Sequence, residues 1–378
     1  MDFTFTEEQQ AVVEAAKAIF ADVAPDAVPS PALTPGAVAD DFDRALWSRL
    51  ADADLLGVLV DAEHGGVGLD AIALCLVLRE SAKVLARVPL LESGAAAYAV
   101  GAHGGEELKR RVLPAAARGE LVLTVAASGR TGHDPAELAV TAQRDGDSWV
   151  LNGLQTAVPW ARNADLIVVP GHTPEGRTVL ALVPREQPGL TIAEQVSTSG
   201  ERLGEVHLES VRVTASDVID ADGAWDGLRD LLATGTCALA LGLGEGVLRM
   251  TSEYTSKREQ FGHPVATFQA VAVQAADRYI DLRAMEATLW QAAWRVSTGA
   301  DGALPTAGDV AVAKIWASDG VRRVVQTAQH LHGGFGADTD YPLHRYHAWA
   351  KQLELSLGPA AAHEEALGDL LAAHALGC

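Results

Sequence analysis

The chain has 378 residues, of which 48% are hydrophobic and 21% are charged, a composition typical of a globular protein rather than a disordered one. A chain of this length can bury a large core and suggests two or three structural units. Its formal net charge of -21 argues against a nucleic-acid partner, because a phosphate backbone would be repelled. A small anionic ligand is not excluded, because it responds to local charge.

The cysteines and the hydropathy of the chain indicate the cellular compartment of the protein. The three cysteines, Cys75, Cys237 and Cys378, are odd in number and lack the spacing of a metal site, which favours a reduced compartment. No charged-then-apolar leader opens the chain, and no apolar run approaches the roughly 18 residues that a membrane span needs. We therefore expect a soluble cytoplasmic protein without a bound metal or a membrane partner.

Helical patterns dominate residues 1–120, which we expect to form an N-terminal helical domain. Thr6-Glu7-Glu8-Gln9 has the form of a capping box, so a helix is expected to start near residue 6 and to include the apolar run to Phe20. Helical periodicity returns in 43–53 after a proline-rich loop. The glycine-rich stretch 63–68 then precedes another helical pattern, and its acidic lead-in favours a tight turn over a phosphate cradle.

Residues 121–224 change to short β-rich runs separated by Gly, Asp and Pro. These runs are Leu121–Val125, Ala139–Ala142, Trp149–Leu151, Leu166–Val169, Val179–Val183, Val206–Leu208 and Val211–Val213. They predict a middle β domain, a small barrel or sandwich. No G-x-G-x-x-G follows a strand and opens a helix, so a Rossmann cofactor site is not supported.

Residues 225–378 are helical again and predict a C-terminal bundle. The patterns at 228–255, 268–297 and 305–331 are long and apolar, and a last helix is expected from about Pro359. Long helices with apolar stripes at this spacing pack as an antiparallel bundle. The expected fold class is therefore α+β, with a helical domain, a β-barrel domain and a helical bundle in that order.

Two motifs stand at ends of these C-terminal helices. The first, KREQFGHPVATFQ at 257–269, joins two helices through a turn marked by Gly262 and Pro264. Its Arg258 offers a fork of donors suited to phosphate oxygens. The second, LHGGFG at 331–336, has glycines where a backbone can approach a ligand closely. Taken singly each signal is weak, because Gly-Gly after a helix is usually a plain helix stop.

Together, in this order and spacing, the two motifs resemble those of the acyl-CoA dehydrogenase flavoprotein family, and the resemblance extends over essentially the whole chain. It implies an acyl-CoA dehydrogenase-like fold and FAD as the cofactor. It also implies that the arginine turn and the Gly-Gly loop of one subunit reach the flavin of its neighbour. The residues to which it assigns these contacts are Arg258, Phe261, Gln269, His330, Gly333 and Gly334, with His330 where the family usually has glutamine.

The family's reaction removes two hydrogens from the α and β carbons of an acyl-CoA thioester. A carboxylate takes the α proton from the face opposite the flavin, and the β hydrogen leaves as hydride. The commonest family base position, just before a glycine, is Leu357 here, and the alternative on the helix ahead of Arg258 is Leu232. Leucine cannot take a proton. Glu354 and Asp230 are nearby carboxylates, of which Glu354 is a weak candidate base, but a solvated face is favoured for both.

The flavin contacts expected within the chain itself also depart from the family. Thr124 matches a family contact, but Ala157 and Pro159 stand where a Trp and a Thr are usual, and VAASG at 125–129 replaces an acidic segment. Trp160, His344 and His347 are conceivable pocket residues, although packing is the commoner role for such side chains.

This chain combines leucines at both base positions with retained contacts for a neighbouring subunit. In this combination it resembles one subunit of the actinobacterial heterotetrameric dehydrogenases of the steroid side-chain type, the subunit that lacks the catalytic glutamate. The stretch 338–358 is similar to that subgroup. The favoured hypothesis is therefore one half of such a heterotetramer, acting on a bulky acyl-CoA thioester while a second dehydrogenase subunit supplies the base. The alternatives are a self-sufficient homotetrameric dehydrogenase with a relocated carboxylate, and a scaffold or biosynthetic member that does not dehydrogenate.

Overall fold

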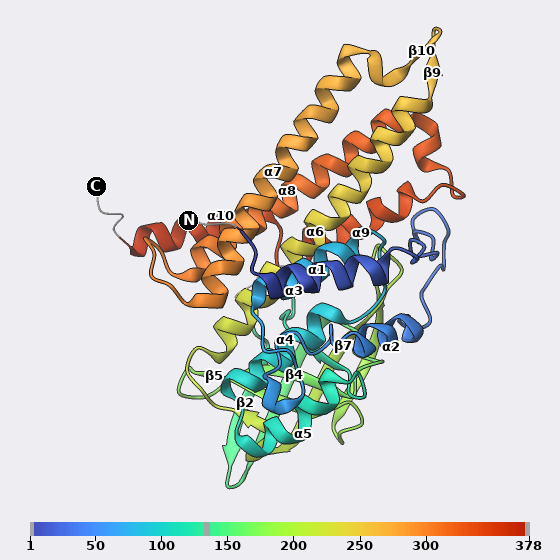
Figure 1. Ribbon diagram of the computed structural model, residues 1–378. Helices are drawn as coiled ribbons and strands as arrows, with labels where there is room; N and C mark the ends of the chain where they lie inside the picture. Colours follow the sequence, from blue (N-terminus) through green and yellow to red (C-terminus); the bar gives the residue numbers. More distant parts are fainter. Residues whose placement is uncertain (1–3, 132–136, 375–378) are drawn as a thin grey trace.

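The structure is a computed structural model that describes residues 4–131 and 137–374. A β-sheet with small helices around it forms one end of the molecule, and long helices project from the other (Figure 1). The first helices along the chain are α1 (Glu7–Phe20), α2 (Arg44–Asp52), α3 (Ala71–Ala82), α4 (Leu90–His103) and α5 (Glu106–Ala117). Helices α1 and α3 lie between the sheet and the projecting helices.

The predicted capping box at the start of α1 is confirmed. The Thr6 hydroxyl accepts a hydrogen bond from the Gln9 backbone N–H at 3.2 Å, and the Gln9 side-chain oxygen accepts one from the Thr6 N–H at 3.0 Å. The Gln9 amide also donates to the carboxylate of Asp70, which caps α3. The Gln9 side chain therefore caps the N-terminus of α1 and joins it to the N-terminus of α3.

The middle of the chain forms one connected sheet. Its strands are β1 (Leu123–Val125), β2 (Val140–Asp145), β3 (Ser148–Pro159), β4 (Leu166–His172), β5 (Thr178–Pro184), β6 (Leu190–Val196), β7 (Arg202–Thr214) and β8 (Val218–Ile219). They follow the order β6-β7-β3-β2-β4-β5-β8, and β1 pairs in parallel with β4. Inward side chains such as Leu151, Ile167 and Val206 give the sheet a hydrophobic core of its own.

Two features of the sheet differ from the sequence prediction. The runs predicted as separate strands at 206–208 and 211–213 are one strand, β7, which continues through Ser210 at a φ of 51°. Strand β6 was not predicted, because it lies at the end of the sheet order and buries few side chains. An edge strand of this kind carries little hydrophobic alternation.

The C-terminal part is a helical bundle built around α6 (Ala224–Lys257). It also contains α7 (Gln269–Thr298), α8 (Thr306–His332), α9 (Leu343–Leu355) and α10 (Ala360–Ala373), with a small hairpin of β9 (Glu259–Gln260) and β10 (His263–Pro264). Helix α6 is long and apolar enough to cross a membrane, which corrects the expectation that no such run exists. However, 83% of its most apolar window is buried inside the protein, as in a core helix.

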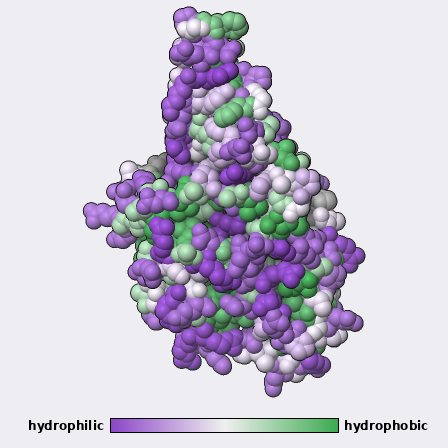
Figure 2. Space-filling model, turned by 90° about the vertical axis from the view of Figure 1, so that its right-hand side faces the viewer, coloured by the Kyte–Doolittle hydropathy of each residue, from purple (hydrophilic) through white to green (hydrophobic). Residues whose placement is uncertain are grey.

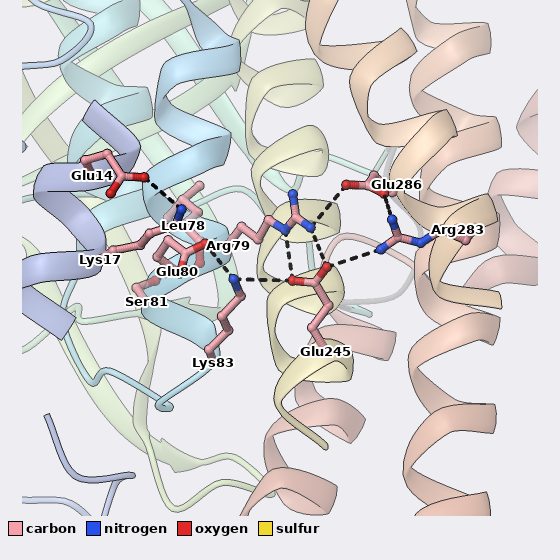
Figure 3. Close-up of polar contacts among 10 residues, drawn as sticks. All are labelled: Glu14, Lys17, Leu78, Arg79, Glu80, Ser81, Lys83, Glu245, Arg283 and Glu286. Atoms are coloured by element: carbon pink, nitrogen blue, oxygen red, sulfur yellow. Dashed lines mark hydrogen bonds and ion pairs between the residues drawn. The ribbon is translucent and has the colours of Figure 1, made fainter. Parts of the chain in front are cut away.

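A network of charged side chains joins α3 to the bundle (Figure 3). Arg79 of α3 donates to both carboxylate oxygens of Glu245 on α6 and lies 3.1 Å from the Glu286 carboxylate on α7. Lys83 and Arg283 each approach Glu245 within 3.5 Å. The helices meet closely here, because a Cβ on Gly242 would lie 2.0 Å from the Arg79 carbonyl oxygen.

Removal of Arg79 from this network is expected to destabilise the fold. Burial alone would raise the pKa of Glu245, but the hydrogen bond and charge of Arg79, with help from Lys83, hold it below its usual value. A lowered carboxyl pKa contributes stability above the unfolded-state value of 4.5, and this stability is lost as pH falls through the folded-state value. We expect Arg79→Met to lower the free energy of unfolding by about 2–3 kcal/mol near neutral pH, measured by urea titration.

The matched control is Glu106→Gln, which removes the ion pair between the exposed Glu106 carboxylate and Lys109 within α5. It should change the free energy of unfolding by less than about 0.5 kcal/mol. Equal effects of the two substitutions, or an Arg79→Met effect that does not shrink below about pH 4, would contradict a stabilising role for the network.

Candidate functional site

A cavity of about 360 Å³ lies where the N-terminal helices, the sheet and the bundle meet. Its lining comes from α3, α4, β1, β3, the turn before β7, α6, α9 and the turn after α9. Most lining residues are apolar, and a few polar side chains lie among them. A largely apolar pocket with a small number of convergent polar groups is the usual form of a small-molecule site.

The structure brings both expected base positions to this one cavity. Leu232 lines it from α6, and Leu357 lines it from the turn that follows α9. That turn is unusual, because Leu357 has a φ of 57°, and its carbonyl accepts a hydrogen bond from the His363 ring at 2.8 Å. Hydrocarbon side chains thus border the cavity at both positions where the resemblance predicts a carboxylate.

The turn that carries Leu357 is held from behind by a buried ammonium. Lys314 on α8 is fully buried. Its Nζ donates to the Ser318 hydroxyl at 2.8 Å, the Gly358 carbonyl at 2.9 Å and the Glu354 carbonyl at 3.3 Å. Burial lowers the pKa of this amine to about 8. The position of the turn that carries Leu357, one wall of the cavity, therefore depends on Lys314, a residue that the sequence analysis did not single out.

The two carboxylates weighed as alternatives lie elsewhere. Glu354 does not line the cavity: its carboxylate pairs with Lys351 at 2.6 Å and lies 3.9 Å from Arg322. It is also mostly buried, at 14% side-chain exposure, rather than on a solvated face as expected. Asp230 is likewise half-buried and absent from the described lining, and burial raises its pKa to about 6.

Two carboxyl groups that sequence reasoning missed do line the cavity, those of Glu92 and Glu201. Glu92 on α4 accepts a hydrogen bond from the Trp160 indole at 3.1 Å, and Glu201 accepts one from the Gln352 amide at 2.7 Å. Burial, then the nearby charge of Glu201, raises the pKa of Glu92 to about 7. The available signal was Glu92 as a lone charge in the apolar run that opens α4.

Of the three side chains set aside as packing residues, Trp160 belongs to the cavity and the histidines do not line it. His344 is buried and donates to the Tyr341 carbonyl at 2.8 Å. His347 is half-buried, and burial lowers its pKa. Both histidines are therefore packing residues, as expected. Trp160 packs against Phe42 and also borders the cavity.

The residues expected to reach a neighbouring subunit lie on the outside of the projecting bundle. Arg258, Phe261, Gln269, His330, Gly333 and Gly334 are all exposed. Phe261 reaches 91% exposure in the β9–β10 hairpin. Figure 2 shows the projection as a narrow column above a wider body, with hydrophobic atoms at its tip. Val273, Tyr279 and Ile280 are exposed along α7, a surface typical of a subunit contact.

Aromatic stacking joins the end of α6 to the Gly-Gly turn. The Tyr254 ring, one helical turn before Arg258, stacks on His332 at 4.3 Å and on Phe335 at 5.5 Å between ring centroids. Gly333 has a φ of 60°, and neither Gly333 nor Gly334 has an atom within 4 Å of where a Cβ would stand. The end of α6, where the first motif begins, therefore lies beside the Gly-Gly turn of the second motif. A ligand can approach the backbone of the two glycines from outside the protein.

The exposure of these residues is compatible with the predicted contact to a neighbouring subunit's dinucleotide, which stays a prediction. Within the part of the chain that the structure describes, Arg258 forms no ion pair, so its guanidinium is free for a phosphate. By contrast, Thr124 is fully buried and its hydroxyl donates to the Pro159 carbonyl at 2.6 Å. A flavin contact through that hydroxyl would require the bond to open, and it stays a prediction.

Comparison with known proteins shows the family to which the chain belongs. The family model of the acyl-CoA dehydrogenase N-terminal domain matches residues 6–120, and that of the C-terminal domain matches residues 232–371. Acyl-CoA dehydrogenase FadE27 of Mycobacterium tuberculosis is 37% identical over 336 residues, 88% of this chain and 89% of that protein. Probable acyl-CoA dehydrogenase FadE25 of the same species is 30% identical, covering 84% of each chain.

Two solved structures are similar over nearly their full length. One is described as a variant of the Tcur3481-Tcur3483 steroid ACAD, with a TM-score of 0.89 and 38% identity, covering 97% of this chain and 98% of that one. The other is the ChsE4-ChsE5 complex from Mycobacterium tuberculosis, with a TM-score of 0.88 and 36% identity, covering 98% and 99%.

Proposed function

Because the chain belongs to the acyl-CoA dehydrogenase family of FAD-dependent oxidoreductases, we propose that it is one subunit of a heteromeric dehydrogenase that desaturates a bulky acyl-CoA thioester. A second family member supplies the base, and this chain supplies contacts to the flavin across the interface. The descriptions of the two similar structures name two-component assemblies, one of them a steroid ACAD. Cys75 and Cys237 are free and buried, which supports a reducing, cytoplasmic location.

The observation that carries this proposal is the pair of leucines in the cavity. Proton abstraction needs a carboxylate at a fixed place relative to the α carbon. The two places that the resemblance assigns to it are Leu232 and Leu357, and both line the cavity. FAD, when bound, accepts the β hydrogen as hydride. With no acceptor for the α proton at either place in this chain, the proposal assigns that proton to a residue of the partner.

The exposed end of the bundle supplies the contacts that this chain contributes. Arg258 at the end of α6 can direct two N–H donors at phosphate oxygens. The exposed Phe261 ring offers an apolar surface, and the backbone at Gly333 and Gly334 can be approached without a side chain in the way. These groups bind and orient the dinucleotide of the neighbouring subunit, while the aromatic stack behind them keeps the turn in place.

The test compares the chain alone with the chain co-expressed with a family member that has a glutamate at a base position. We expect the single chain to be colourless and the complex to be yellow and bleached by an acyl-CoA thioester. Bleaching should disappear when the partner's glutamate becomes glutamine. A single chain that is yellow and bleached by a thioester would show that no partner is needed, and a yellow complex that never bleaches would favour a scaffold.

The alternative of a relocated base now has definite candidates. Among the described carboxylates, Glu92 and Glu201 reach the cavity and Glu354 does not. A pKa of about 7 at Glu92 suits a general base near neutral pH. If the single chain is active, Glu92→Gln and Glu201→Gln should identify the base through loss of thioester bleaching, whereas Glu354→Gln should leave bleaching intact.

A further inference from the structure

We propose that the cavity of this chain is itself a ligand site for a neutral, largely apolar molecule that carries a hydroxyl or keto group. In this site Glu92 and Glu201 recognise the oxygen and reject carboxylates. The inference goes beyond the proposed function, because it requires no flavin, no partner subunit and no turnover.

The size and the walls of the cavity fit an apolar ligand. Its volume of about 360 Å³ lies within the range of small-molecule pockets. Leucines from four helices line it, among them Leu78 of α3, Leu91 of α4, Leu239 of α6 and Leu353 of α9. Since elements from all parts of the chain contribute, the cavity exists only in the folded protein.

The polar groups of the lining are oriented by hydrogen bonds. The Trp160 indole N–H fixes one oxygen of Glu92, and the Gln352 amide fixes one oxygen of Glu201. All four side chains line the cavity. A carboxyl group retains hydrogen-bonding capacity after one such contact. Each acid can therefore present a second oxygen to a ligand.

The charge state of the acids favours a neutral ligand over an anion. Neither carboxyl lies within ion-pair distance of a described lysine, arginine or histidine, although the charge of Arg87 acts on Glu201. Burial raises the pKa of both groups, to about 7 for Glu92. A protonated carboxyl donates through its O–H and accepts through its carbonyl oxygen, which matches either an alcohol or a ketone. A ligand carboxylate would instead add a negative charge beside two acids in a poorly hydrated space.

A cationic ligand is disfavoured by Arg87. This guanidinium is buried, donates to Asp26 and to the Ser199 carbonyl, and its charge already acts on Glu201. Its side chain also stacks over Trp349, a cavity-lining residue, at 5.0 Å from the ring centroid. Because Asp26 compensates much of this charge, Arg87 contributes only part of the preference for a neutral oxygen over an ammonium.

The experiment is calorimetric titration of the full chain, alone or in the complex, with three probes that share one hydrocarbon cage. These are 1-adamantanemethanol, 1-adamantanecarboxylate and 1-adamantanemethylamine, each at about pH 7. We expect the alcohol to bind at least about 10-fold more tightly than the carboxylate and more tightly than the amine. Leu239→Trp, which fills the cavity, should abolish binding and so locate the site.

Substitution of the acids tests their role. Glu92→Gln and Glu201→Gln should each bring the affinity for the carboxylate closer to that for the alcohol, while Glu354→Gln, outside the cavity, should leave the ratio unchanged. Absence of binding by all three probes, or a carboxylate or amine that binds as tightly as the alcohol, would overturn the inference. If an acid variant fails to fold, the inference is still tested by the selectivity of the unsubstituted chain among the three probes and by the Leu239→Trp result. Because no step needs activity, failure of the heteromeric proposal would leave this result intact.

Discussion

Arg258→Met is expected to lower the FAD affinity of the assembled dehydrogenase by about 100-fold. A charge-assisted hydrogen bond contributes roughly 1.5–3 kcal/mol, and each 1.4 kcal/mol corresponds to about tenfold in affinity. Arg258 lies at the exposed end of α6, where its N–H bonds to the Tyr254 carbonyl at 2.8 Å and its carbonyl accepts from Val265 at 2.8 Å. These bonds fix the backbone at this position and do not depend on the side chain, so methionine keeps them and removes the charged fork.

The measurement is a titration of the apo complex with FAD, followed by flavin fluorescence. Lys257→Met is the matched control, because Lys257 is the neighbouring exposed cation at the end of the same helix. It should change the affinity by less than about threefold, in line with the small effect of a non-specific surface charge. If both variants bind FAD alike, the guanidinium does not contact the dinucleotide, and the assignment of Arg258 is wrong.

Lys314→Met is expected to lower the free energy of unfolding by about 2–4 kcal/mol. The substitution keeps most of the apolar volume but leaves the carbonyls of Gly358, Glu354 and Leu353 without the donor that they share. Each unsatisfied buried carbonyl costs about 1–3 kcal/mol. The substitution also removes the cost of burying the ammonium, so the net loss of stability is smaller than the summed cost of the carbonyls. Urea unfolding followed by circular dichroism measures it.

Lys351→Met provides the comparison for this prediction. Lys351 lies near the end of α9, is 39% exposed and pairs with Glu354 within one helical turn. Its loss should cost less than about 0.5 kcal/mol. A Lys314→Met protein as stable as Lys351→Met would mean that the ammonium does not hold the turn that carries Leu357.

Features that depend on neighbours in the chain were predictable from the sequence. The capping box at Thr6 and Gln9 is confirmed because both partners lie within one helical turn. The long apolar helices α6, α7 and α8 were found within a few residues of their ends for the same reason. Strand β6 and the continuity of β7 were missed. Both depend on pairing with other strands, which the alternation of hydrophobic and polar residues along one segment does not reveal.

The sequence by itself also determined the residues that the resemblance places at the family positions: leucines at 232 and 357, and an arginine turn followed by a Gly-Gly loop. Only the tertiary structure decided which acids share a cavity with those leucines. Glu92 and Glu201 come from segments far apart in the chain, and Glu354, next to Leu357 in sequence, turns away to Lys351. The physical reason is that burial and desolvation, which raise the pKa of Glu92, are produced by residues brought together from every part of the fold.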